Sequence, residues 1–175
     1  MRRLVPTVAL TIVLALSAAA CLPAPEPVQN GRLPDSALTT VTPSCRIAND
    51  VADPLRALMG IAWAQGSPVQ PETQAYVAPL PSPPSVQSCY RDYDMQVWWR
   101  QFYCFFSSCD YAAVPGTSVH GWGRAVDFED SGGELTFSSA GYQWLQAHAA
   151  EFGFFHPAWA EPGGSSPEPW HWEHS

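Results

Sequence analysis

Residues 118–128, which read SVHGWGRAVDF, constrain the fold more than any other part of this chain. Gly121 and Gly123 lie close together, and glycine destabilises the interior of a helix, so we expect no stable helix here. The RAVDF that follows has the composition of a β-strand. This places His120 in a loop or at a strand end and Asp127 on a neighbouring strand. Because glycines let the backbone turn tightly, the two side chains are predicted to converge on one point.

The last eight residues, EPWHWEHS, contain a second group of polar side chains. The residue before a proline is pushed towards extended conformations, so Glu168 is not expected in a helix. His171 then lies on a short terminal strand, with Trp170 and Trp172 on the opposite face. Glu168 and His171 can point the same way only if the chain bends near Pro169.

The two imidazoles of His120 and His171 and the carboxylate of Asp127 suit Zn²⁺ as ligands. Three protein ligands leave a fourth position for water, which is typical of a catalytic zinc site, whereas four protein ligands close a structural site. A nearby carboxylate can take a proton from the attacking water and pass it to the leaving amine. Glu168, held off the metal by Pro169, is suited to that role. The competing interpretation is an ordinary polar cluster at a strand end, with Glu168 as a surface acid.

The N-terminus predicts export. Residues 1–20 contain two arginines, then an apolar run too short to span a bilayer, then small residues, which is typical of a secretory signal peptide. The SAAA before Cys21 favours a lipoprotein with lipid on Cys21, and ordinary secretion is the alternative. Residues 21–29 then form a proline-rich tether, and residues 30–175 form one folded domain.

Export permits disulfides among the four remaining cysteines. Cys104 and Cys109 are close in sequence and flank a turn-like FFSS, so we predict that they pair, which assigns Cys45 to Cys89. A thiolate zinc site is the weaker alternative, because the sequence contains no C-x-x-C pair.

The charge of the chain argues against nucleic acid as a partner. The formal net charge is −8, and removal of residues 1–20 takes away Arg2 and Arg3 but no acid, so the mature chain carries −10. A chain without lysine offers few cations to phosphates and gains little from anionic lipid head groups. Eight tryptophans and 46% hydrophobic residues indicate a folded, aromatic-rich domain.

Three helices are expected, over residues 53–66, 93–104 and 138/139–153. Asp53 is the predicted N-cap of the first, with Pro54 as its first helical residue. Gln96 and Arg100 fall outside the apolar face of the second. Residues 67–85 hold too many prolines for a helix or a central strand and should form a surface loop. The predicted core-facing stripes are Leu55, Leu58, Met59 and Ala62; Met95, Trp98, Trp99 and Phe102; and Tyr142, Leu145, Ala149 and Phe152.

Two motifs resemble those of a known family. SVHGWGRAVDF is similar to the S-x-H-x-x-G-x-A-x-D motif, and EPWH to the E-x-W-H motif, of the VanY-type D-alanyl-D-alanine carboxypeptidases, which are grouped with the lysostaphin-type peptidases and the hedgehog signalling domain. NGRLPDSAL near residue 30, CYRDYDMQ around Arg91 and YQWLQAHAAEFGFFHPAW have the order and spacing expected for that family. The resemblance therefore covers the chain from Asn30 onwards.

The resemblance implies a role for each polar residue of these motifs. The zinc ligands would be His120, Asp127 and His171, and the catalytic base would be Glu168. Arg91 would bind the substrate and stabilise the oxyanion, a task that suits the planar, always charged guanidinium. A surface ion pair with one of its aspartate neighbours, Asp92 or Asp94, is the simpler interpretation of Arg91.

Gln96 and Ser118 match positions that line the substrate site in relatives, and Trp170 is expected to wall the cleft. The family has glycine where this chain has Cys89. A disulfide there would pin the backbone that carries Arg91, although a bulkier residue could also shift it.

The remaining histidines are expected to be structural. His148 borders the apolar stripe of its helix, and His156 precedes a proline in an irregular stretch. His174 could act as a pair with His171, but it lies one residue from the C-terminus and we expect this end to fray.

The resemblance implies an α+β fold in which a small, mainly antiparallel sheet carries the zinc site and helices flank it. The implied function is that of a zinc-dependent D-alanyl-D-alanine carboxypeptidase that cleaves peptidoglycan stem peptides. One alternative is a peptidoglycan endopeptidase or L,D-carboxypeptidase with the same zinc site. Another is a non-catalytic zinc-containing wall-binding module, against which the presence of both Glu168 and Arg91 argues. We expect a monomer whose partners are stem peptides, with membrane contact only through a lipid on Cys21.

Overall fold

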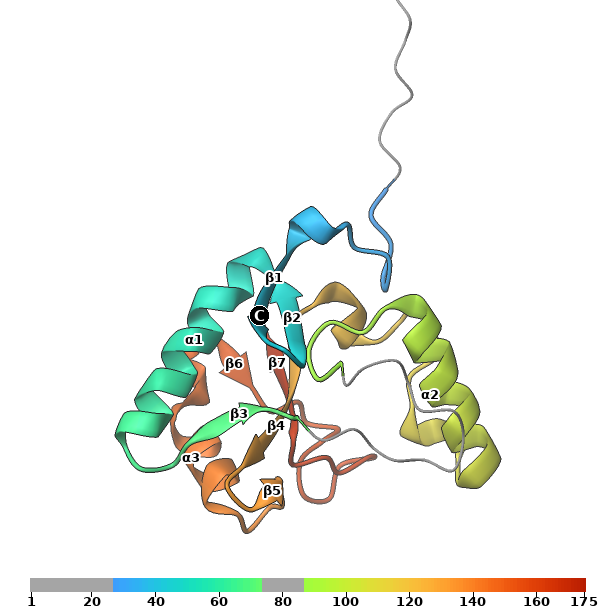
Figure 1. Cartoon of the computed structure of the whole chain (residues 1–175). Helices are drawn as coiled ribbons and strands as arrows, with labels where there is room; N and C mark the ends of the chain where they lie inside the picture. Colours follow the sequence, from blue (N-terminus) through green and yellow to red (C-terminus); the bar gives the residue numbers. More distant parts are fainter. Residues whose placement is uncertain (1–26, 74–86) are drawn as a thin grey trace, which may run out of the picture.

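Two antiparallel sheets and three helices make up the computed structural model, which describes residues 27–73 and 87–175 (Figure 1). The smaller sheet is a hairpin of β1 (Leu38–Thr42) and β2 (Cys45–Ala48). The larger has the order β3-β4-β7-β6, with β5 also paired to β4. Its strands are β3 (Val69–Pro71), β4 (Ala125–Asp130), β5 (Gly133–Glu134), β6 (Phe154–Phe155) and β7 (His171–His174). The described strand pairs are antiparallel, so the predicted α+β class is confirmed.

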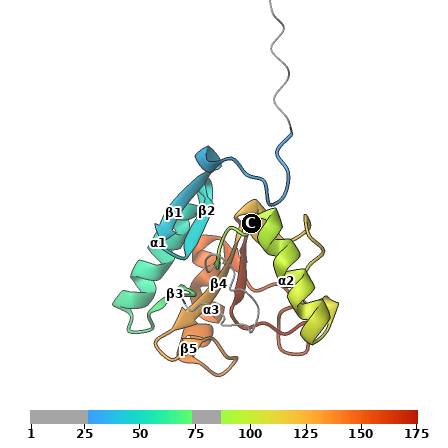
Figure 2. The same cartoon turned by 45° about the vertical axis from the view of Figure 1, so that its right-hand side comes forward.

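The helices lie on two sides of the larger sheet (Figures 1 and 2). On one side are α1 (Asn49–Ala64) and α3 (Ala140–His148), and on the other is α2 (Tyr93–Phe106). Four short 3₁₀ turns connect these elements: η1 (Asp35–Ala37), η2 (Cys109–Tyr111), η3 (Val119–Trp122) and η4 (Ala149–Phe152).

Strand alternation separates the core from the polar side of the sheet. Val126 and Phe128 of β4 and Trp172 of β7 are at most 2% exposed and belong to the main hydrophobic core, which also includes residues of α1 and α3. Because successive side chains of a strand point to opposite faces, Asp127, His171 and their neighbours at every second position face away from this core.

The first helix begins earlier than predicted. Asp53 is not its N-cap, because α1 starts at Asn49, directly after β2, and Pro54 lies inside the helix. The side chain of Asn49 accepts a hydrogen bond from Thr39 and donates one to the carbonyl oxygen of Ser36. These tertiary bonds hold the first turn, and a proline in the second turn removes one intrahelical hydrogen bond. The predicted end is confirmed, since Gly66 has a positive φ of 79° just beyond the helix.

The predicted loop over residues 67–85 is wrong at its start. Val69–Pro71 forms β3, which pairs with β4 from Val69 opposite Asp130 to Pro71 opposite Phe128. A proline is tolerated because β3 is an edge strand, where one side of the backbone has no ladder to complete. Residues 74–85 of the predicted loop lie outside the described residues.

The second helix is two residues longer than predicted and uses its faces differently. Met95 and Phe102 are buried as expected, whereas Trp98 and Trp99 are half-buried. Gln96, predicted to lie on another face, is buried at 3% exposure. The buried face of α2 therefore includes a hydrogen-bonded polar side chain, which hydrophobicity alone does not predict.

The third helix follows the prediction closely. It starts at Ala140, continues into η4 and ends at Gly153, whose φ is 78°. Tyr142, Leu145 and Ala149 are buried. Phe152, the last member of the predicted stripe, is half-buried and packs against the core.

Both predicted disulfides are present. Cys45 and Cys89 join β2 to the segment before α2, and Cys104 and Cys109 join the end of α2 to η2. No helix in residues 27–73 or 87–175 is long and apolar enough to cross a membrane. The predicted signal peptide, the start of the tether and the predicted lipid site at Cys21 lie outside the described residues.

Candidate active site

Strand register brings two of the predicted ligands together. Asp127 of β4 lies directly opposite His171 of β7. On one side of this pair Val126 lies opposite Trp172, and on the other the N–H of Phe128 donates to the carbonyl oxygen of Trp170. Residues opposite each other in an antiparallel pair have Cβ atoms about 4.5–5.5 Å apart on the same face. The seven-residue spacing from His120 to Asp127 therefore matters less than the pairing of Asp127 with the C-terminal strand.

His120 reaches the same point from η3. The predicted loop contains this single 3₁₀ turn, and the chain leaves it through Gly123, whose φ of 64° and ψ of 33° are left-handed. A Cβ on Gly123 would lie 2.8 Å from the backbone nitrogen of Ala48, so a larger residue would clash with β2. This tight exit turns the chain from η3 into β4 and leaves the His120 ring facing Asp127.

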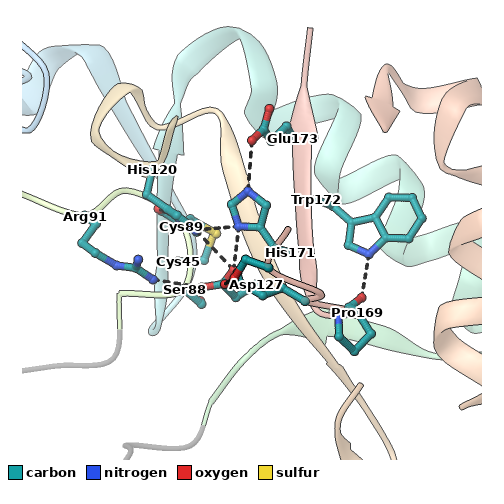
Figure 3. Close-up of polar contacts among 12 residues, drawn as sticks. Cys45, Ser88, Cys89, Arg91, His120, Asp127, Pro169, His171, Trp172 and Glu173 are labelled. Carbon is teal, nitrogen blue, oxygen red and sulfur yellow. Dashed lines mark hydrogen bonds and ion pairs between the residues drawn. A yellow bond between two sulfur atoms is a disulfide. The ribbon is translucent and has the colours of Figure 1, made fainter. Parts of the chain in front are cut away.

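Three ligand atoms form a nearly equilateral triangle. His120 Nε2 lies 3.1 Å from His171 Nδ1 and 3.2 Å from Asp127 Oδ1, and His171 Nδ1 lies 3.2 Å from the same oxygen (Figure 3). Ligands about 2.0–2.2 Å from Zn²⁺ at tetrahedral angles are about 3.3–3.6 Å apart, so this set fits one such ion. Across the described ranges, no other group of three His, Cys, Asp or Glu side chains is placed to share a metal.

The second nitrogen of each imidazole has its own partner. His120 Nδ1 donates to the carbonyl oxygen of Cys89 at 2.7 Å, which leaves Nε2 for a metal. His171 Nε2 lies 3.1 Å from Glu173 Oε1, which leaves Nδ1 for a metal (Figure 3). Such outer partners fix the ring orientation of metal-binding histidines. The Cys45–Cys89 disulfide thus holds the carbonyl group that orients His120.

Glu173 was missed in the sequence, although a signal for it was present. It lies two residues after His171 on a strand, so both side chains point to the same face. The pattern HWEH places an acid at that position, and its carboxylate is 13% exposed in the structure.

The electrostatics around the three ligands favour a positive charge at their centre. Burial lowers the pKa of His120, with Arg91 adding to the effect, so the ring is neutral. Burial alone would raise the pKa of Asp127, but His120, His171 and Arg91 outweigh it and hold the pKa well below its usual value. Burial likewise opposes charge on His171, yet its hydrogen bonds with Asp127 and Glu173 raise the pKa to about 9. Two carboxylates that favour a proton on this ring also favour a metal ion beside it.

Glu168 joins the cleft through a turn at Pro169. The backbone N–H of His171 donates to the carbonyl oxygen of Glu168 at 3.1 Å, which is the bend that the sequence required. Ser166 donates to Glu168 Oε1 at 3.2 Å. Burial, together with the nearby charge of Asp127, raises the pKa of Glu168 to about 7.

Arg91 points at the same cluster. Its Nη2 donates to Asp127 Oδ2 at 2.9 Å, so Oδ1 faces the imidazoles while Oδ2 holds the guanidinium. The predicted alternative, a surface pair with a neighbouring aspartate, is not the arrangement found, because Asp92 caps α2 by accepting from the N–H of Met95. Arg91 Nε is buried and has no hydrogen-bond partner among the described residues.

These groups line one cleft of about 830 Å³, between the sheet and α2. Ser118 and Trp170 line it too, as expected from the resemblance, and so does Gln96. The amide of Gln96, however, is already bonded on both atoms, to Asn30, to the carbonyl oxygen of Arg91 and to the N–H of Gly116. These bonds hold the Gln96 side chain in the wall of the cleft.

The other histidines lie outside this cluster. His148 pairs with Glu151 at 2.9 Å, and the His156 ring stacks on Trp172 with centroids 4.9 Å apart, both as structural histidines. The expected fraying at His174 is wrong, because it belongs to β7 and its N–H donates to the carbonyl oxygen of Arg124. Pairing with β4 and β6 orders the end of the chain.

A family model described as VanY, D-alanyl-D-alanine carboxypeptidase, matches residues 82–175. A D-alanyl-D-alanine carboxypeptidase of Enterococcus faecalis (strain ATCC 700802 / V583) is 40% identical over 67 residues, which are 37% of this chain and 25% of that protein. The chain thus aligns with a quarter of the length of this curated relative.

Solved structures show the same fold. A mutant of the vancomycin resistance D,D-pentapeptidase VanY from a VanB-type cassette, in complex with Zn(II), is 25% identical, with a TM-score of 0.56 and coverage of 81% of this chain and 82% of that chain. VanYB in complex with D-alanine-D-alanine is 25% identical, with a TM-score of 0.54 and coverage of 78% and 76%. An L,D-carboxypeptidase, DacB, from Streptococcus pneumoniae is 26% identical, with a TM-score of 0.52 and coverage of 77% and 68%.

Proposed function

The chain belongs to the VanY family of D-alanyl-D-alanine carboxypeptidases, and on that premise we propose that it is a zinc-dependent enzyme that removes the terminal D-alanine from peptidoglycan stem peptides. One observation carries the proposal. A three-ligand set that fits zinc shares a cleft with a half-buried carboxylate, Glu168, and with a single guanidinium, Arg91. A binding module has no use for a proton acceptor beside its metal, whereas peptide hydrolysis requires one.

Glu168 is the proposed base and acid. When held by His120, Asp127 and His171, zinc would supply Lewis acidity towards the scissile carbonyl and the attacking water. Glu168 takes the proton of that water and returns it to the leaving amine. A pKa of about 7, raised by burial, suits a group that must accept and donate at neutral pH. The hydrogen bond from Ser166 holds one carboxylate oxygen in place, at 3.2 Å.

Arg91 is the proposed receptor for negative charge. Among the described residues that line the cleft, Arg91 is the one arginine, and there is no lysine. The acids that line it are Glu72, Asp110, Asp127, Glu134, Glu168 and Glu173. A carboxypeptidase substrate brings a free carboxylate into this acidic cleft. The Arg91 side chain is 20% exposed, and its guanidinium offers a planar fork of donors to such a carboxylate.

Replacing Glu168 tests the function. Glu168→Gln keeps the shape of the side chain but cannot accept a proton, so turnover of a stem pentapeptide should fall about 10²–10⁴-fold. Zinc content, measured by elemental analysis, should stay at the parent's value. Glu161→Gln, which changes an acid outside the cleft, is the matched control and should keep the parent's rate. Undiminished turnover by Glu168→Gln would refute the role given to this residue.

The bond that is cleaved needs a separate experiment. The L,D-carboxypeptidase DacB is 26% identical with a TM-score of 0.52, close to the 25% and 0.56 of VanY, so L,D cleavage is the second candidate. Three substrates distinguish the possibilities by mass spectrometry: a pentapeptide ending in D-Ala-D-Ala, a tetrapeptide ending in one D-Ala, and a cross-linked dimer. We expect loss of one D-alanine from the pentapeptide. Cleavage of the dimer alone would indicate an endopeptidase, and zinc binding without any hydrolysis a binding module.

We also propose that the protein acts outside the cytoplasm. The support is the predicted signal peptide over residues 1–20 and the two disulfides, which oxidising compartments favour. Lipid on Cys21 would tether a monomeric domain at the membrane through residues 21–29. The mass of the mature protein tests this, because lipidation adds acyl chains to a chain that begins at Cys21.

A further inference from the structure

We propose that Asn30 and Gln96 form a joint that sets the position of Arg91 relative to the His120 turn. Asn30 is then a positioning residue that acts through Gln96, which lines the same cleft. The inference rests on the proposed function, because it concerns the same cleft. It extends that function to the segment directly after the predicted tether.

Both N–H bonds of the Gln96 amide have partners within the protein. Its Nε2 donates to Asn30 Oδ1 at 3.1 Å and to the carbonyl oxygen of Arg91 at 3.0 Å, and a primary amide has two N–H bonds. Its Oε1 accepts from the N–H of Gly116 at 2.8 Å. With 3% of its surface exposed, Gln96 is a buried crosslink between the Arg91 backbone and the chain that leads into η3.

Asn30 completes the crosslink on the other side. Its Nδ2 donates to the carbonyl oxygen of Ser118 at 2.7 Å, while its Oδ1 accepts from Gln96. The next residue, Gly31, donates its N–H to the carbonyl oxygen of Gly121 at 2.8 Å and accepts from the N–H of Tyr93 at 2.9 Å. One short segment thus bonds both to the first turn of α2 and to η3.

Regular secondary structure does not make this connection. The α2 helix lies on the opposite side of the larger sheet from α1 and α3 (Figure 1). Two direct bonds also cross here. The N–H of Arg91 donates to the carbonyl oxygen of His120 at 3.1 Å, and His120 Nδ1 donates to the carbonyl oxygen of Cys89 at 2.7 Å. The Asn30–Gln96 joint lies beside these bonds and, together with them, holds the segment that carries Arg91 against the His120 turn.

The atoms around the Asn30–Gln96 joint are closely packed. A Cβ on Gly121 would lie 1.9 Å from Asn30 Oδ1 and 2.5 Å from Gln96 Nε2. Gly31 has a φ of 75°, and a Cβ there would lie 2.7 Å from the backbone nitrogen of Tyr93. Glycine is required at both positions because two polar side chains and two backbones meet there.

Asn30→Ala, compared with Asn49→Ala, tests the joint. Each asparagine donates one side-chain hydrogen bond and accepts one, but Asn49 lies at the start of α1, away from the cleft. We expect Asn30→Ala to lower kcat/KM for the stem pentapeptide at least tenfold, mainly through KM, with zinc content unchanged. Asn49→Ala should stay within twofold of the parent.

Gln96→Met gives a second, independent variant. Methionine keeps the length of the side chain and loses all three hydrogen bonds, so a role in packing alone predicts activity within twofold of the parent. We expect a loss at least as large as that of Asn30→Ala. Gln146→Met, at an exposed glutamine of α3 that bonds Tyr142 and Glu161, is the control for this substitution.

Amide hydrogen exchange without substrate separates the joint from the proposed function. In Asn30→Ala, the backbone amides of both segments, residues 89–96 and 116–121, should exchange at least tenfold faster than in the parent. In Asn49→Ala, the exchange rates of both segments should be unchanged. If the parent cleaves no stem peptide, the proposed function fails and this measurement still decides the joint. Should Asn30→Ala fail to fold, Asn30→Asp keeps the acceptor for Gln96 and removes the bond to Ser118. Unchanged exchange, unchanged kcat/KM in Gln96→Met, or an equal loss in Asn49→Ala would overturn the proposal.

Discussion

Loss of the Glu173 carboxylate should weaken zinc binding without touching a ligand. In the structure this carboxylate lies 3.1 Å from His171 Nε2 and helps to raise the pKa of that ring to about 9, against the opposing effect of burial. Outer partners of metal-binding histidines are worth about 10–100-fold in metal affinity. Because the Glu173 side chain is 13% exposed and that of His171 6%, solvent screens this pair less than a surface ion pair. We therefore expect a loss near the upper end, about 2.0–2.7 kcal/mol in Glu173→Ala.

Competition with a chromogenic chelator measures this loss as a zinc Kd. Glu173→Gln keeps an oxygen that accepts a neutral hydrogen bond, so its Kd should fall between those of the parent and of Glu173→Ala. The matched control is Glu161→Gln, which removes a carboxylate 3.3 Å from another buried histidine, His156, that is not in the metal set. A zinc Kd for Glu173→Ala equal to that of the parent would show that the carboxylate does not support the metal site.

Three further predictions concern stability. Serine at both cysteines of the Cys89 disulfide should cost ~4 kcal/mol in urea unfolding, against ~2 kcal/mol for the Cys104 disulfide, because their sequence separations are 44 and 5; equal losses would contradict the loop-entropy argument. Trp172→Ala should cost about 3–5 kcal/mol of unfolding free energy, because the ring is 2% exposed in the core; a smaller loss would show that the site collapses around the cavity. The hydrogen bond from Arg124 lowers the pKa of Asp50 in the folded state, so its stabilisation is present above the unfolded pKa and is lost as pH falls. Asp50→Asn should therefore lower stability by under about 1 kcal/mol at pH 7 and by nothing near pH 2; a difference that persists at pH 2 would rule out this ion pair as its cause.

Much of the candidate site could be predicted because its residues sit beside glycine and proline. Gly123 turns the chain between His120 and Asp127, and Pro169 sets the bend that brings Glu168 to the cleft. These restrictions act on the backbone within a few residues, so they can be recognised locally. The α3 helix was predictable for the same reason, since its apolar spacing and terminal glycine are local signals.

Other features depend on contacts between distant segments. The start of α1 at Asn49 is set by bonds to Thr39 and Ser36, which override the local signal of Asp53 and Pro54. The edge strand over Val69–Pro71 exists because β4 lies beside it.

The sequence alone determined which side chains supply the chemistry, because motif residues next to glycine or proline have few backbone conformations to choose from. Tertiary structure decided how they meet. The register that puts Asp127 opposite His171, the support of His171 by Glu173 and the burial of Gln96 against Asn30 all arise from pairing and packing across long stretches of chain. Local spacing does not encode such contacts, since their free energy exists only once the separate segments have come together.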